Sequence, residues 1–169
     1  MKLFKQVLKP ETIDLILEEA QSSFTENVWC SSALSWTDGI RVGSLASAFC
    51  KPLSPSHRRR VLEEIHTTLP PHNKLFVDIY VWPPGACISE HDDSRHLWGA
   101  TIYLNEDWHV NYGGIFLWFD EKTQEWKMKV PEYNTLMLND EQERHLITPV
   151  TYATRYLRYT LQIFAAQET

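Results

Sequence analysis

Two segments near the N-terminus place apolar residues at every third or fourth position. They are residues 10–24 and 54–69, and this period places the apolar side chains on one helix face. Each segment carries a proline in its first turn, Pro10 and Pro55, where a missing N–H does not break a helix. Ser54 is a candidate N-cap of the second segment. The pattern predicts two helices.

Between these helices, Asp38-Gly39 is flanked by apolar and aromatic residues, which predicts a β-hairpin. After residue 71 the pattern changes to short β-rich segments, several bounded by Pro, Gly, Asn or Asp. Eight such segments can be distinguished: 74–82, 86–92, 98–105, 113–120, 125–130, 135–140, 145–150 and 155–165.

Two helices followed by eight strands predict a mainly β fold with supporting N-terminal helices, a double-stranded β-helix or jelly roll. The 169 residues suit one domain, large enough to bury a core without disulfides or structural zinc. We expect a single domain over 1–169, with helical support and the hairpin in 1–70 and the jelly-roll core in 71–169.

The net charge and the cysteine content indicate which binding partners and which cellular compartment to expect. The net charge of −6 argues against a general nucleic-acid-binding protein. The three cysteines, Cys30, Cys50 and Cys87, are scattered and form no CxxC motif, which indicates reduced thiols in a cytoplasmic setting. The first 20 residues contain no uninterrupted apolar stretch, so we expect no signal peptide, no transmembrane helix and no membrane partner.

A candidate metal site begins with His91 and Asp93, which lie two positions apart, the spacing that places side chains on one face of a strand. His145, at the start of the seventh strand-like segment, can supply a third ligand. Two imidazoles and one carboxylate on one face of an octahedron suit Fe(II) and leave three positions for other ligands. Taken alone, the His-x-Asp pair is weak evidence, because such pairs arise often by chance, and a solvated pair at a turn is then the favoured interpretation.

The other histidines are weaker candidates. His96 follows Asp93 by three positions, and we expect it in a connection, at the surface or lining the mouth of the site. His57 and His66 fall in the predicted helical part, where solvated or capping roles are expected.

Four blocks of sequence, in order, carry a resemblance to a known family. They are "YVWPPG" (80–85), "TIYLNEDW" (101–108), "GGIFLWF" (113–119) and "HLITPVTYATRY" (145–156). With the His-x-Asp pair, they make the chain resemble the 2-oxoglutarate- and Fe(II)-dependent dioxygenases, especially their prolyl-hydroxylase-like branch. The likeness covers roughly residues 75–165.

The resemblance implies roles for individual residues. His91, Asp93 and His145 would hold Fe(II), and 2-oxoglutarate would chelate the metal as cosubstrate with O2. Ascorbate is a candidate reductant. Arg155, ten positions after His145, would anchor the far carboxylate of 2-oxoglutarate, and Tyr103 would help to hold it. A core aromatic is the alternative role of Tyr103. Trp82 replaces the tyrosine usual in the family, so we expect it to form a wall of the pocket.

A second arginine competes for the anchoring role. Arg158 is followed two positions later by Thr160, which resembles the Arg-x-Ser/Thr anchor of other branches of the family. Arg155 and Arg158 differ in strand parity, so only one of them can face the metal on a regular strand. The spacing from His145 favours Arg155.

These features predict an enzyme that hydroxylates an unactivated C–H bond, with a prolyl residue of a protein or peptide as the preferred substrate. The carboxylate of Asp93 favours hydroxylation, because halogenating relatives lack it. A hydroxylase of a free amino acid or small metabolite is one alternative, and a non-catalytic jelly-roll binding protein is another. Trp98 and Trp108 are expected near the mouth, in reach of a substrate.

Overall fold

The computed structural model describes residues 1–22, 24, 28–31 and 37–167. Two α-helices, α1 (Pro10–Ser22) and α3 (Pro55–Ile65), precede most of the strands. Two short 3-10 helices, η2 (Asp38–Arg41) and η3 (Val110–Tyr112), lie in connections. No helix in this part of the chain is both long and apolar enough to cross a membrane.

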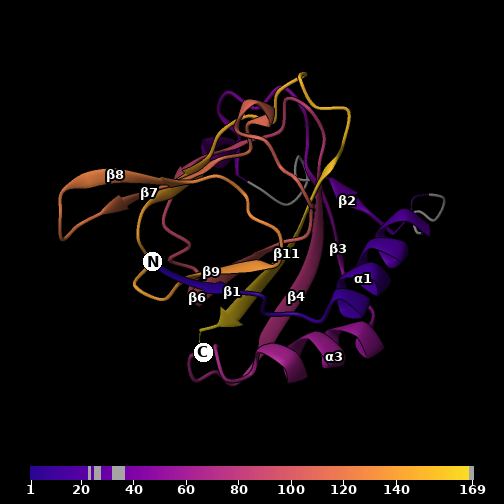
Figure 1. Ribbon diagram of the computed structural model, residues 1–169. Helices are drawn as coiled ribbons and strands as arrows, with labels where there is room; N and C mark the ends of the chain where they lie inside the picture. The colour runs from indigo at the N-terminus through magenta and orange to yellow at the C-terminus, as the bar shows by residue number, and fades with distance from the viewer. Residues whose placement is uncertain (23, 25–27, 32–36, 168–169) are drawn as a thin grey trace.

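The strands form two antiparallel sheets (Figure 1). The major sheet has the order β1 (Lys2–Lys5), β9 (Thr135–Asn139), β6 (His96–Tyr103), β11 (Arg158–Ala166), β4 (Leu75–Trp82), β3 (Phe49–Pro52) and β2 (Cys30–Ser31). The minor sheet has the order β5 (Ile88–His91), β10 (His145–Ile147), β7 (Phe116–Asp120) and β8 (Glu125–Lys129). The predicted mainly β, helix-supported jelly roll is confirmed.

All eight strand-like segments predicted after residue 71 are strands, β4 to β11. The pattern missed β1, β2 and β3, which are two to four residues long and too short to show a clear alternation. The hairpin turn predicted at Asp38-Gly39 is wrong, because these residues begin the 3-10 helix η2. Part of the segment around it, residues 32–36, lies outside the described residues.

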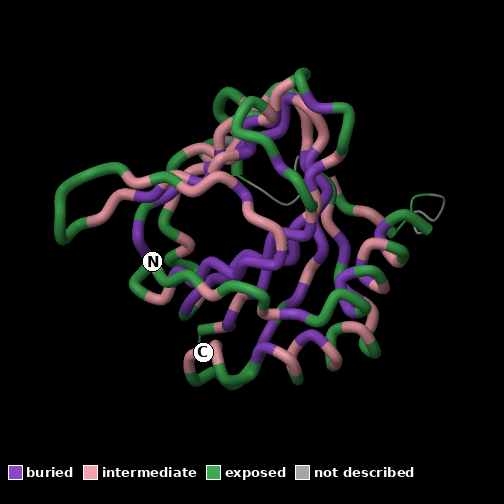
Figure 2. Tube along the Cα trace, in the orientation of Figure 1, coloured by how far each residue is buried: buried purple, intermediate pink, exposed green. Residues whose placement is uncertain are grey.

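One face of the major sheet is covered by the two helices, which lie together on one side of it in Figure 1. Ile13 and Ile16 of α1 and Val61 and Ile65 of α3 are fully buried. They belong to one core cluster with alternate residues of the strands: Leu75, Val77, Ile79, Ala100, Ile102, Leu136, Leu138, Leu161, Ile163 and Ala165. In Figure 2 the buried colour runs along these central strands, while the outer helix surfaces are exposed.

The intervening residues of the same strands face the minor sheet. A second core cluster fills part of this space, with Tyr80, Trp82, Tyr103 and Met137 from the major sheet and Phe116 and Ile147 from the minor sheet. Strand alternation thus divides each central strand between a helix-side core and the space between the sheets. The candidate site lies in that space.

Candidate active site

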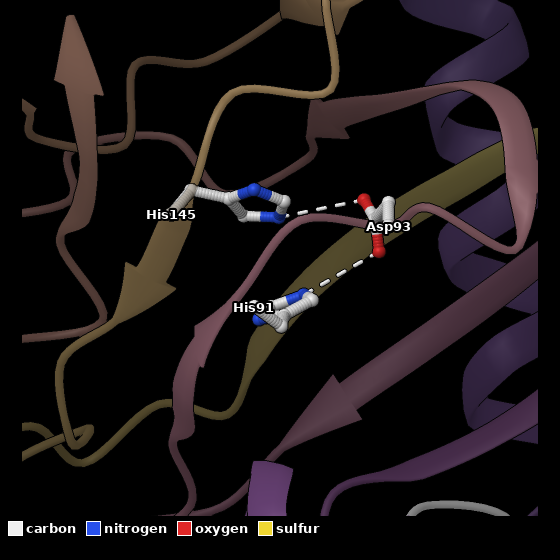
Figure 3. A group of neighbouring side chains, drawn as sticks. All are labelled: His91, Asp93 and His145. Atoms are coloured by element: carbon white, nitrogen blue, oxygen red, sulfur yellow. Dashed lines mark ion pairs between the residues drawn. The ribbon is translucent and has the colours of Figure 1, made fainter. Parts of the chain in front are cut away.

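His91, Asp93 and His145 come together between the sheets, as Figure 3 shows. His91 ends β5 and His145 begins β10, and the two residues are paired directly across these neighbouring strands. Asp93 Oδ1 lies 3.4 Å from His91 Nε2, and Asp93 Oδ2 lies 3.4 Å from His145 Nε2. One donor atom from each residue lies within 4.8 Å of the other two. A single ion at the centre can therefore contact all three.

Hydrogen bonds fix which imidazole nitrogen faces the centre. His91 Nδ1 lies 2.8 Å from the carbonyl oxygen of Ser89, and His145 Nδ1 lies 2.9 Å from that of Glu143. A carbonyl oxygen only accepts, so each Nδ1 carries the hydrogen. In the neutral ring each Nε2 then presents a lone pair toward Asp93, as a metal ligand must.

Asp93 lies just beyond the end of β5, not on the strand as the two-residue spacing predicted. Its φ of +55° is in the left-handed region, which Asp adopts more readily than most residues. Gly99 on β6 leaves room for it, because a Cβ at this position would lie 3.0 Å from Asp93 Oδ2. Backbone conformation and a missing side chain together place this carboxylate between the two imidazoles.

The charges of these three groups are coupled. Burial alone would raise the pKa of the Asp93 carboxyl, but its interactions with His145 and His91 outweigh burial and hold the pKa well below its usual range. Burial lowers the pKa of His145, and the neighbouring His91 acts in the same direction. The group thus presents an ionised carboxylate beside a neutral imidazole, a donor set that matches Fe(II).

The three residues line a cavity of about 670 Å³ between the sheets, within the range of small-molecule sites. Its wall includes inner-face residues of the major sheet, among them Asp78, Tyr80 and Trp82 on β4 and Gln162 and Phe164 on β11. Phe116 on β7 and Ile147 on β10 contribute from the opposite sheet.

Arg155 does not reach this space, so the expectation that it faces the metal is wrong. The residue is exposed and lies in the bend that precedes β11. The hydroxyl of Thr154 accepts a hydrogen bond of 2.9 Å from the Tyr156 N–H and closes a local turn there. Strand alternation begins only three residues later, at Arg158.

Arg158 is the arginine that points between the sheets. Its relative exposure is 1%, and its guanidinium lies 5.0 Å from the ring centroid of Trp82 and 5.4 Å from that of Tyr103. None of its three side-chain nitrogens has a hydrogen-bond partner within the described part of the chain. Burial lowers the pKa of Arg158 to about 10, still well above neutral pH. A buried cation with free donors calls for an anionic ligand.

The surroundings of Arg158 are shaped to hold it. Gly114 has a φ of +61°, and a Cβ there would lie 2.8 Å from Arg158 Cδ, so any side chain would displace the guanidinium. On the other side Trp82 Nε1 donates a 3.0 Å hydrogen bond to Thr160 Oγ1. Trp82 lines the cavity as predicted.

Tyr103 is fully buried beside Arg158. Its hydroxyl lies 3.1 Å from the sulfur of Met137, to which it donates. Burial raises the pKa of Tyr103 to about 12, although Arg158 acts in the opposite direction. Tyr103 is therefore a neutral hydrogen-bond donor next to the buried cation.

The remaining sequence candidates lie elsewhere. His96 lines the cavity, but on strand β6 and not in a connection, and it stacks on Phe164 with ring centroids 4.4 Å apart. Trp98 belongs to the helix-side core, and Trp108 is buried with its Nε1 donating to the Gly113 carbonyl. Neither tryptophan lines the cavity, so their expected position near its mouth is wrong.

Sequence reasoning missed Asn139, Gln162 and Asp78. Asn139 is buried beside His145, and its side chain makes hydrogen bonds of 2.9 and 3.0 Å to the backbone of Glu143, whose carbonyl orients that histidine. Gln162 and Asp78 are cavity-lining polar residues inside otherwise apolar strands. The available signal was strand parity, because both positions share a face with Trp82 and Arg158.

Comparison with solved structures identifies the fold. The chain is similar to a prolyl-4-hydroxylase from Pseudomonas putida at 15% identity and a TM-score of 0.73, over 98% of this chain and 92% of that one. A prolyl hydroxylase from Trichoplax adhaerens, in complex with a hypoxia inducible factor peptide fragment, is 14% identical with a TM-score of 0.71 over 98% and 82% of the two chains. A 2OG-Fe(II) oxygenase family protein from Burkholderia pseudomallei is 12% identical with a TM-score of 0.62 over 90% and 79%.

No protein-family model matches the sequence, and no curated protein matches it. The structural likeness therefore establishes the fold alone, which is that of the 2-oxoglutarate- and Fe(II)-dependent oxygenases. The resemblance to the prolyl-hydroxylase-like branch, predicted from four sequence blocks, is confirmed at this level.

Proposed function

We propose that the protein is an Fe(II)- and 2-oxoglutarate-dependent dioxygenase that hydroxylates an unactivated C–H bond. The observation that supports this most is the combination of two groups between the same two sheets. One is the His91–Asp93–His145 cluster, and the other is the buried, unpartnered guanidinium of Arg158. A binding protein without turnover needs no such pairing of a metal site with a carboxylate anchor.

The residues divide the work between them. His91, Asp93 and His145 would hold Fe(II) through Nε2, a carboxylate oxygen and Nε2. Arg158 would bind the far carboxylate of 2-oxoglutarate, because a buried guanidinium can give charge-assisted hydrogen bonds to a carboxylate. This role was expected of Arg155 and is here assigned to Arg158. Tyr103 borders the guanidinium, and the ring of Trp82 excludes water from one face of it.

When bound, Fe(II) and 2-oxoglutarate supply the oxidising chemistry, consuming O2 and releasing succinate and CO2. The protein supplies position and a poorly hydrated cavity. Asp93 occupies the carboxylate position of the metal site, which favours transfer of oxygen to the substrate as a hydroxyl group.

A prolyl residue of a protein or peptide is the preferred substrate class. Support comes from two structural neighbours that are prolyl hydroxylases, one of them with a peptide fragment. The cavity size also accommodates a free amino acid or small metabolite, which stays the alternative.

The direct test is succinate release from the Fe(II)-loaded protein with 2-oxoglutarate, O2 and ascorbate, screened with prolyl peptides and free amino acids. We expect a substrate to raise succinate formation above the uncoupled background, with a mass gain of one oxygen atom in the product. Absence of succinate with and without every candidate, in protein that binds Fe(II), would favour the non-catalytic jelly-roll protein.

A further inference from the structure

Three polar residues form one row across the inner face of the major sheet. Asp78 on β4 is paired in register with Gln162 on β11, and Gln162 is paired with Thr101 on β6. All three line the cavity. Thr101 Oγ1 donates a 2.7 Å hydrogen bond to Gln162 Oε1, and Gln162 Nε2 donates to Thr160 Oγ1 at 3.3 Å. The amide and hydroxyl groups of this row therefore already have partners.

Asp78 is the exception. Its side chain is half-buried and forms no hydrogen bond or ion pair of its own with any residue that the structure describes. The charge of Arg58 on α3 acts on the Asp78 carboxyl, but Arg58 Nη2 donates its 2.6 Å hydrogen bond to the Leu75 carbonyl. Burial raises the pKa of the Asp78 carboxyl, as expected for a charge without a compensating partner.

The charge balance of a site with Fe(II) and 2-oxoglutarate bound would leave Asp78 without a counter-charge. A bound Fe(II) would balance the two carboxylates of 2-oxoglutarate, and Arg158 would balance Asp93. Asp78 would then be the uncompensated negative charge on the inner face of β4 and β11. The next row toward the strand ends consists of Phe76, Phe164 and Gly99, and Phe76 and Phe164 line the cavity as well. The Phe164 ring stacks on His96, and Lys74 Nζ lies 5.0 Å from the centroid of the Phe76 ring. A cation is thus already accommodated on an aromatic ring near Asp78, the setting that favours an organic cation.

We infer that Asp78 is a specificity-determining residue that binds a cationic nitrogen of the substrate, an ammonium or a guanidinium. The inference rests on the proposed function, because it takes the substrate to lie in the same cavity as the metal. The cation has two sources, a basic side chain in a peptide or a free basic amino acid. Both present the same chemistry to Asp78.

Distances along the sheet fit this assignment. Asp78 and Gly99 are separated by two strand spacings and one two-residue step, roughly 12 Å between Cα atoms. Gly99 marks the metal end of this span, because a Cβ there would lie 3.0 Å from Asp93 Oδ2. Side chains extend into the cavity from both ends of that span. A lysine- or arginine-sized substrate group can therefore reach Asp78 while another carbon of the substrate lies beside the metal.

The test uses calorimetric binding to protein loaded with Mn(II) and 2-oxoglutarate. Each pair of probes differs in its positive charge: lysine against norleucine and arginine against citrulline. Each is offered as the free amino acid and within an acetylated, amidated dipeptide with proline. We expect the charged member of at least one pair to bind at least tenfold more tightly than the neutral member. A preference seen with the free amino acids indicates a free basic amino acid as the substrate, and a preference seen with the dipeptides indicates a peptide.

Variants assign the preference to one carboxylate. Asp78→Asn should reduce the preference below threefold, and Asp78→Glu, which keeps the charge, should retain part of it. Asp107→Asn is the matched control, because Asp107 is exposed and does not line the cavity, and it should keep the full preference. Equal binding of charged and neutral probes by the wild type, or a preference that survives in Asp78→Asn, would overturn the assignment.

Metal and 2-oxoglutarate binding separate a failure of the Asp78 assignment from a failure of the proposed dioxygenase function. Protein that binds Mn(II) and 2-oxoglutarate but does not distinguish the probes rejects the role of Asp78 and leaves the proposed dioxygenase intact. Protein that binds Mn(II) but not 2-oxoglutarate rejects the dioxygenase and the role of Asp78 with it.

Discussion

The two faces of the major sheet are built from the same strands but do different things. On β11, Leu161 and Ile163 face the helices with no exposed surface, while Arg158, Thr160 and Gln162 face the minor sheet. The helix face of the central strands β4, β6, β9 and β11 is apolar. The inner face combines aromatic rings with a buried cation, a polar row and the cavity. Residues that stabilise the fold thus alternate along the strand with residues of the candidate site. A substitution on the helix face should lower stability and spare ligand binding, and a substitution on the inner face should do the reverse.

The largest effect on the inner side is expected from the metal ligands. His145→Ala or Asp93→Ala should weaken Mn(II) binding more than a hundredfold, beyond the 10–100-fold typical of residues that only support a ligand. Calorimetry with Mn(II) measures this. His96→Ala is the control, since His96 lines the same cavity without joining the cluster. Equal losses in the control and the ligand variants would reject the site.

On the helix side, Leu161→Ala should lower the free energy of unfolding by about 2–5 kcal/mol, the usual cost of emptying a fully buried leucine site. The variant should keep its Mn(II) affinity, because Leu161 faces away from the cavity. Denaturant unfolding and metal titration of the same sample separate the two effects. A large loss of metal affinity in folded Leu161→Ala protein would break the proposed division between the faces.

Asn139→Ala should have an intermediate effect on the metal site. Asn139 makes two hydrogen bonds to the backbone of Glu143, whose carbonyl accepts from His145 Nδ1. Without them the imidazole is less well oriented, and we expect roughly a tenfold loss of Mn(II) affinity. Unchanged affinity would show that the loop holds His145 without this side chain.

The smallest effect concerns a polar cluster on the helix side. Glu19 accepts hydrogen bonds from Lys51 Nζ and the Ser54 N–H and contacts His57 Nδ1. Burial raises the pKa of Glu19, but these partners outweigh burial and lower it. A lowered acid pKa stabilises the fold above the ordinary value near 4.5, and this stability is lost as the pH falls.

Glu19→Gln should therefore lower the free energy of unfolding by about 1 kcal/mol at pH 7. The difference from wild type should narrow as the pH falls below about 4.5. Denaturant unfolding as a function of pH measures it, with the exposed neighbour Glu18→Gln as the control. A difference that persists unchanged at pH 3 would mean that the carboxylate charge of Glu19 is not its source.

The same contrast explains what could be predicted from the sequence. Uniform apolar alternation made the strands from Leu75 onward predictable, and His91, Asp93 and His145 were found because metal ligands must be specific residue types at compatible spacing. Asp78 and Gln162 were missed because the sequence does not show whether a polar residue within an apolar strand lines a cavity. Their significance depends on which residues face them across β4, β11 and β6.

Arg155 was favoured because of its spacing from His145, and the structure does not place it in the cavity. Its ten-residue spacing from His145 matches the family, but spacing cannot show where a strand begins. The turn closed by Thr154 delays β11 to Arg158. This delay places Arg155 outside the sheet and Arg158 on its inner face.

The central claim is that a metal site and a carboxylate anchor lie between the same two sheets, and 2-oxoglutarate binding to Mn(II)-loaded protein tests it most directly. The account predicts measurable binding by wild type and by Arg155→Ala, whose exposed side chain should matter little. Arg158→Ala should bind Mn(II) normally but lose well over tenfold in affinity for 2-oxoglutarate, since an unpaired buried carboxylate typically costs about 2–5 kcal/mol. Tight 2-oxoglutarate binding by Arg158→Ala, with loss in Arg155→Ala, would contradict it.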